Sequence, residues 1–166
     1  KGHQYLITIA LKNTPEKEYP KIVNEFESLL ETYGRSVITY SLQIDYNHFL
    51  AFKMGRKEDA IANLKTLSDL KLTLFQEARV KMELADILVY DEKFNKALIY
   101  YSQIQKKVSS NVLAQQARFK VAQTSYFKGD FEWAQIQLDV LRKSSSQLIA
   151  NDAMQLSLMI RDNTLE

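Results

Sequence analysis

Hydrophobic positions along the chain follow the spacing of amphipathic helices. Within residues 78–89, apolar side chains recur at intervals of three and four, and the same spacing returns within residues 94–104 after a polar break at 91–93. Residues three or four positions apart share one face of an α-helix, so each segment predicts a helix with one buried face. The next break contains Gly129, which can end a helix, and Asp130, which can cap the following one. The pattern therefore predicts pairs of helices joined by short turns.

The predicted helix pair is repeated along the chain. Ala60, Ala97 and Ala134 are separated by 37 residues in each step, and neighbouring positions repeat with them. The aligned apolar sets that follow are Leu64, Tyr101 and Leu138, then Leu67, Ile104 and Leu141. Upstream, Ala85 and Ala122 align with His48. A period between 20 and 50 residues is typical of helical-repeat architectures.

Residues that begin helices mark several expected helix starts. Thr73 with Gln76, and Ser144 with Gln147, have the spacing of a capping box, in which two side chains satisfy backbone N–H groups at a helix start. We therefore expect one helix to begin after Thr73 and another after Ser144.

The second and third copies resemble the tetratricopeptide repeat (TPR) family, in particular its bacterial arrays. The family pattern has a small residue in the first helix, a turn with glycine, an aromatic residue at the start of the second helix, then alanine and a bulky residue one turn later. The matching residues are Ala85, Phe94, Ala97 and Tyr101 in one copy, and Ala122, Gly129, Phe131, Ala134 and Leu138 in the next. The repeat departs from the family because it exceeds the usual length of about 34 residues, lacks a closing proline and has His48 at a small-residue position.

The resemblance implies an all-α chain folded as a right-handed α-solenoid of TPR-like helix hairpins, with about eight helices. We expect one domain over residues 1–166, with a degenerate first unit at 1–39, repeats at about 41–77, 78–114 and 115–151, and an unfinished unit at 152–166. Residues 16–33 are expected to form the second helix of the degenerate unit. Residues 5–11 are either the remnant of its first helix, which we favour, or an added strand. Because the chain begins without Met and ends in Leu165-Glu166, we interpret it as a piece of a longer protein.

Charge and hydropathy argue against two classes of partner. The chain has 22 basic and 20 acidic residues, a net charge of +2. This lacks the basic excess typical of proteins that bind nucleic acid or anionic lipid, so no nucleic-acid partner is expected. The longest apolar stretch, residues 5–11, is much shorter than the roughly 20 residues of a membrane-spanning helix. The absence of cysteine leaves the cellular compartment undecided.

The residues of an enzyme site are also missing from the sequence. No cysteine can act as a nucleophile, and a catalytic serine would need a base, for which only His3 and His48 are present. The acidic residues and histidines do not cluster with metal-ligand spacing, and four isolated glycines cannot form a phosphate-binding loop. We therefore expect no enzymatic activity, no metal and no cofactor, and we interpret His48 as a helix-packing residue.

The resemblance implies a protein-interaction scaffold. In TPR proteins the first helices of the repeats line a concave groove that binds a partner peptide or helix. The positions of this chain that match are Asp45, Phe49, Lys53, Arg79, Glu83, Asp86, Tyr90, Gln116, Lys120, Gln123 and Phe127. Their mixed charges do not match the carboxylate clamp of chaperone adaptors, and family analogy suggests a role in bacterial cell-envelope assembly. The alternative is an RNA-binding helical-repeat protein of pentatricopeptide type, because aromatic residues are abundant and interleaved with lysines.

The segment 147–161 predicts a further contact surface. Nine of its fifteen residues are apolar and spread around the helix, so it needs cover on more than one side. We expect this helix either to pair with a second copy of the chain or to expose an apolar patch.

Overall fold

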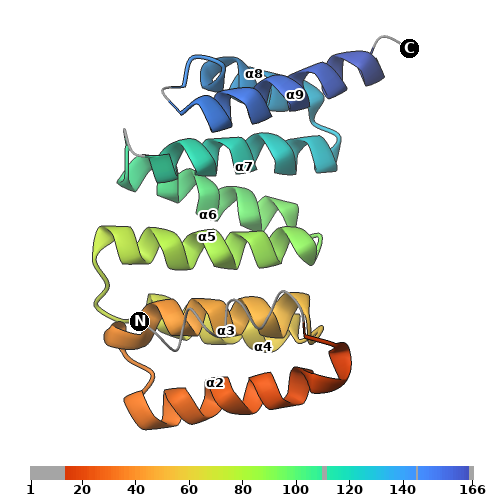
Figure 1. The fold of residues 1–166 in the computed structure, drawn as a ribbon. Coiled ribbons are helices and arrows are strands. Elements are labelled where there is room, and N and C mark those ends of the chain that lie inside the picture. Colours follow the sequence, from red (N-terminus) through yellow and green to blue (C-terminus); the bar gives the residue numbers. More distant parts are fainter. Residues whose placement is uncertain (1–13, 110–111, 145, 165–166) are drawn as a thin grey trace. The chain divides into compact units, whose positions relative to one another are not determined.

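The computed structural model describes residues 14–109, 112–144 and 146–164 (Figure 1). Every regular element within these ranges is helical, which confirms the all-α prediction. Two short 3-10 turns, η1 (Glu16–Glu18) and η2 (Val37–Thr39), accompany eight α-helices in the described ranges. The α-helices are α2 (Tyr19–Tyr33), α3 (Tyr40–Phe52), α4 (Lys57–Ser68), α5 (Leu74–Tyr90), α6 (Phe94–Lys107), α7 (Val112–Lys128), α8 (Phe131–Leu141) and α9 (Gln147–Thr164).

The chain forms two compact units, with the boundary between Leu72 and Thr73. The first unit contains α2 to α4 and the second contains α5 to α9. The expected single domain over residues 1–166 stays a prediction, and the helix expected at residues 5–11 lies outside the described residues.

In the first unit, α3 contacts both α2 and α4. Helix α2 turns Ile22, Phe26 and Leu30 inward, four residues apart, and all three are buried. The Phe26 ring lies 5.3 Å from the ring of Tyr46, on α3. Residues 16–33 were expected to be helical, and they form η1 followed by α2.

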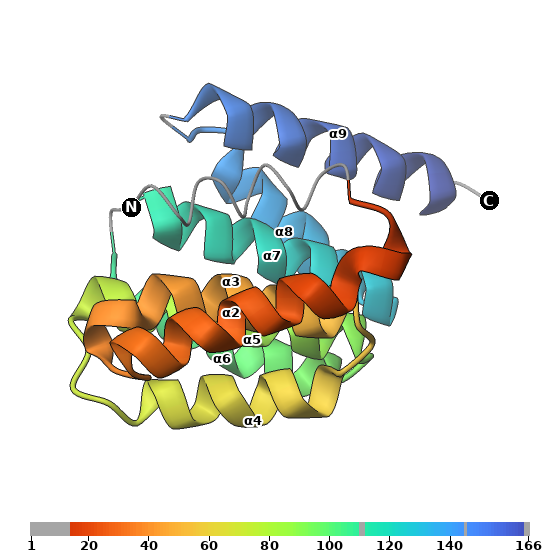
Figure 2. The same cartoon turned by 60° about the horizontal axis from the view of Figure 1, so that its bottom comes forward.

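In the second unit, consecutive helices from α5 to α9 contact one another. Helix α7 also contacts α5 and α9, so the first helix of one pair lies beside the first helix of the next. Both views show α9 beside α7 and α8 (Figure 1 and Figure 2). The core between these three helices contains Ala122 from α7, Leu138 from α8 and Ile160 from α9, together with five other buried residues.

The repeated positions read from the sequence are core positions in each hairpin. Helices α4, α6 and α8 begin at Lys57, Phe94 and Phe131, again 37 residues apart. The three aligned alanines are 0% exposed, which lets the two helices of each pair approach closely. The apolar sets that follow them are at most 2% exposed. The predicted repeat starts at 78 and 115 fall inside α5 and α7, because these helices begin at Leu74 and Val112, a few residues before the predicted starts.

The side-chain caps predicted for the helix starts are formed at α5 and α8, whereas Ser144 makes a different hydrogen bond before α9. Thr73 and Gln76 form the expected capping box at the start of α5, with side-chain to backbone distances of 3.3 and 2.9 Å. Asp130 caps α8 by accepting from the backbone N–H of Trp133 at 3.4 Å. The Ser144 hydroxyl instead accepts from the backbone N–H of Ser146 at 3.1 Å, within the loop before α9.

The segment that a backbone hydrogen bond closes at the turn between α3 and α4 is one residue longer than in the other two hairpins. In each hairpin, the backbone N–H just before the second helix donates to a carbonyl near the end of the first helix. The pairs are Arg56 with Leu50 at 2.9 Å, Lys93 with Leu88 at 2.8 Å and Asp130 with Ser125 at 2.8 Å. The donors are 37 residues apart in both steps, whereas the acceptors are 38 and then 37 residues apart. Helix α3 is therefore shifted by one residue relative to the alignment through the alanines.

This shift corrects the position predicted for His48. Counted from the acceptor carbonyls, Asn47 rather than His48 corresponds to Ala85 and Ala122. Asn47 is 1% exposed, and its side-chain oxygen accepts a 2.9 Å hydrogen bond from Asn63 on α4. His48 is exposed on α3, with its ring centroid 4.5 Å from that of Phe52. The interpretation of His48 as a residue that packs between helices was wrong.

Candidate functional site

Among the predicted groove residues, Phe49 requires a correction. It is 1% exposed and packs in the core of the first unit, with its ring 5.2 Å from Tyr19 and 6.2 Å from Phe26. The one-residue shift of α3 is the reason, because it makes Phe49 equivalent to the buried residues Ile87 and Thr124. A partner cannot reach Phe49 in this structure.

The shift also changes which residues of α3 occupy the remaining groove positions. Asp45 is half-buried and corresponds to Glu83 of α5. Lys53 is exposed but follows the last residue of α3, and Phe52 takes the position of Tyr90 instead. All three hairpins therefore carry an aromatic residue at this position, since the third has Phe127.

In the second unit, the structure brings together two of the predicted residues in a structural network. Asp86 of α5 accepts a 2.5 Å hydrogen bond from the hydroxyl of Tyr101 on α6. The same oxygen lies 3.3 Å from Nζ of Lys120 on α7. Burial raises the pKa of the Tyr101 hydroxyl, and the negative charge and hydrogen bond of Asp86 raise it further. Asp86 and Lys120 thus hold three helices together.

The other predicted residues of the second unit remain on the surface of the first helices. Arg79 on α5 and Gln116 on α7 are exposed, and Glu83 is half-buried. Tyr90 and Phe127 are 52% and 57% exposed, which is high for large aromatic side chains. These two rings are the predicted residues best suited to bury apolar surface against a partner.

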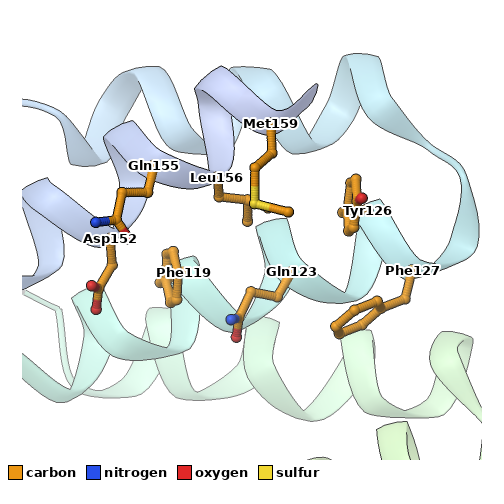
Figure 3. Close-up of a pocket in the computed structure, with 8 residues that line it drawn as sticks. All are labelled: Phe119, Gln123, Tyr126, Phe127, Asp152, Gln155, Leu156 and Met159. Carbon is orange, nitrogen blue, oxygen red and sulfur yellow. The ribbon is translucent and has the colours of Figure 1, made fainter. Parts of the chain in front are cut away.

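A groove lies between α7 and α9 and contains two of the predicted residues, Gln123 and Phe127. Its volume is about 420 Å³. The other residues that line it are Phe119 and Tyr126 from α7, and Asp152, Gln155, Leu156 and Met159 from α9. In Figure 3, Leu156 and Met159 point toward α7, while Asp152 and Phe127 lie at opposite ends of the groove.

The groove has an apolar floor and a short polar rim. Phe119 and Tyr126 pack on the core between α7, α8 and α9, and the Tyr126 ring lies 5.8 Å from the Phe127 ring. Leu156 is 8% exposed, whereas Met159 is 50% exposed. Among the lining residues Asp152 is the single charged side chain. This arrangement suits a side chain or peptide with an apolar face.

Six of the lining residues were absent from the groove predicted from the sequence. Phe119 and Tyr126 lie three or four positions from Gln123, so the helical spacing of α7 could have indicated them. The contribution of α9 depends on its packing beside α7. The repeat pattern did not predict which residues of α9 face α7. Asp152, Gln155, Leu156 and Met159 therefore emerge from the tertiary structure.

The described residues offer neither a metal site nor a membrane span. Within the described ranges, acidic residues and histidines do not gather in groups of three that could hold a metal ion. None of the described helices combines the length and hydropathy required to cross a membrane. No model of a known protein family matches the sequence, and comparison with curated proteins gives no significant match.

Proposed function

We propose that this protein is a TPR-like α-solenoid that acts as a protein-interaction scaffold. In this proposal, the exposed face of the first helices binds a peptide or helix from a partner protein. The observation that carries it is the groove between α7 and α9, in which apolar side chains from two successive first helices converge beside the exposed ring of Phe127.

The chemistry of the exposed face supports binding rather than catalysis. Asp86 and Lys120 of this face are engaged in contacts between helices, and the groove itself presents the amides of Gln123 and Gln155 and one carboxylate, Asp152. Exposed aromatic rings are enriched at the energetic centres of protein interfaces. We therefore propose a non-enzymatic role without a metal or cofactor. Assembly of the bacterial cell envelope is the cellular setting that the family resemblance favours.

The test is capture of partners from the native organism by the full-length protein, followed by binding measurements with variants. Tyr90→Ala and Phe127→Ala should each weaken the captured complex at least tenfold, because both remove exposed aromatic anchors. Ile99→Ala is the matched control, since Ile99 is also 57% exposed but lies on α6, a second helix. Equal binding by all three variants would exclude this face as the binding surface.

RNA binding is the competing outcome of the same experiment. Random RNA oligomers at physiological salt should produce no change in fluorescence anisotropy with the wild-type chain. Tight binding with a steep salt dependence would favour the pentatricopeptide-like alternative, because neutralised phosphates release counterions.

Self-association through α9 is a second candidate role, supported by a separate observation. Leu148, Met154 and Leu158 are 72%, 49% and 51% exposed on α9, in addition to Met159 in the groove. About half or more of each of these three side chains is open to solvent. Burying them against a second copy would remove apolar surface from water, which favours association.

A further inference from the structure

We propose that the groove between α7 and α9 selects a basic amphipathic helix, with apolar residues at one end and a lysine or arginine about two turns away. This inference rests on the proposed scaffold function and specifies the chemistry of the partner. It follows from the separation of apolar and acidic side chains along the groove.

The apolar end of the groove is formed by Phe127 and Met159. Both side chains are at least half exposed, while Tyr126 beside them packs on the core through its contact with Phe131 at 5.6 Å. The floor at this end is therefore held in place, and the exposed side chains above it can close over an inserted leucine or phenylalanine. Methionine suits this role because its unbranched side chain adapts to different shapes.

The acidic end of the groove is formed by Asp152, beside Phe119 (Figure 3). No described residue forms an ion pair with Asp152, and Lys120, on the same helix as Phe119, is paired with Asp86. The amides of Gln123 and Gln155 likewise have no hydrogen-bond partner among the described residues. The groove thus offers one uncompensated negative charge and no positive one, which complements a cationic side chain and disfavours an anionic one.

The separation of the two ends sets the spacing in the partner. Phe119 and Phe127 are eight residues apart on α7, a distance of about 12 Å along the helix axis. Seven residues of a partner helix cover about 10.5 Å. A helix laid along the groove can therefore place an apolar residue against Phe127 and Met159 and a basic residue near Asp152, seven positions away in either direction.

The experiment uses a displayed library of 18-residue amphipathic helices selected on the whole chain. Two apolar residues are held constant one turn apart, and the other exposed positions are randomised. Selected helices should be enriched in lysine or arginine about seven positions from an apolar anchor. Methyl NMR signals of Leu156 and Met159 should shift on addition of a selected peptide. Enrichment of acidic or neutral residues at that position would overturn the inference.

Variants then test the role of the charge. Asp152→Asn should weaken a selected peptide about two- to fivefold, as expected for a partly exposed ion pair. Asp162→Asn, an exposed carboxylate on α9 outside the groove, is the matched control and should leave binding unchanged. Thermal melting monitored by circular dichroism establishes that both variants remain folded.

The failure of this inference can be separated from failure of the proposed function. Loss of binding in Phe127→Ala together with unchanged binding in Asp152→Asn would retain the groove and overturn its charge preference. Absence of any selected helix would overturn the inference, while partner capture sensitive to Tyr90→Ala would still support the scaffold. Peptide binding that tolerates both groove variants would overturn both proposals for this groove.

Discussion

The hydroxyl of Tyr101 donates a 2.5 Å hydrogen bond to the carboxylate of Asp86 across the α5–α6 hairpin. Tyr101 is 1% exposed and occupies a repeated core position, one turn after Ala97. Its counterparts Leu64 and Leu138 are apolar, so this hairpin alone adds a polar contact at that core position. The contact also orients Asp86 toward Lys120 of α7.

Replacement of Tyr101 by phenylalanine should destabilise the second unit by about 1–2 kcal/mol, because a buried hydrogen bond to a charged group is lost while the packing remains. Urea denaturation followed by circular dichroism measures this change. Tyr100→Phe is the matched control on α6, since the Tyr100 hydroxyl has no hydrogen-bond partner among the described residues. Equal stability of the two variants would show that the Asp86 contact contributes nothing.

The repeated alanines should tolerate no charged side chain. Ala97→Glu and Ala134→Glu each place a carboxylate at a position that is 0% exposed, and we expect losses of about 3 kcal/mol or more from overpacking and an unpaired charge. Ser102→Glu, at an exposed position of α6, should change the melting temperature little. A similar small change in the alanine variants would contradict close packing of the paired helices.

Stability should fall at high pH through Tyr46. Burial, the 2.6 Å hydrogen bond to Glu27 and the charge of Glu27 together raise the pKa of Tyr46 to about 12. Unfolded tyrosine ionises near pH 10, so between about pH 10 and 12 the folded state retains a proton that the unfolded state has lost. The free energy of unfolding therefore decreases with pH in this range. Urea titrations at several pH values should give a shallower decrease for Tyr46→Phe than for the wild-type chain, and equal slopes would contradict the role of Tyr46.

Self-association through α9 should depend on its exposed apolar residues. Light scattering across a concentration series should show association of the wild-type chain and its loss in the double variant Met154→Lys, Leu158→Lys. Leu156 is unsuitable for such a test because it is 8% exposed, and a lysine there would disturb the core. Monomeric behaviour of both proteins at all concentrations would exclude α9 as a self-association surface.

Much of the fold was encoded locally and could be read from the sequence. The intervals of three and four between apolar residues identify the buried face of a helix, so the paired helices and the repeated core positions at Ala60, Ala97 and Ala134 were predictable. The capping box of Thr73 and Gln76 was predictable for the same reason, because its two hydrogen bonds join residues three positions apart.

The tertiary structure decided the register of α3 and the composition of the groove. A hydrogen-bonded segment longer by one residue changes the hydrogen-bond partner of Arg56 without interrupting the apolar pattern of α4, so sequence alignment placed His48 and Phe49 on the wrong faces. Likewise, the presence of Phe127 and Met159 in one groove depends on how α9 packs beside α7. Periodicity determines which side of a helix is apolar, whereas the contact between two helices depends on turn geometry and side-chain packing that no single segment contains.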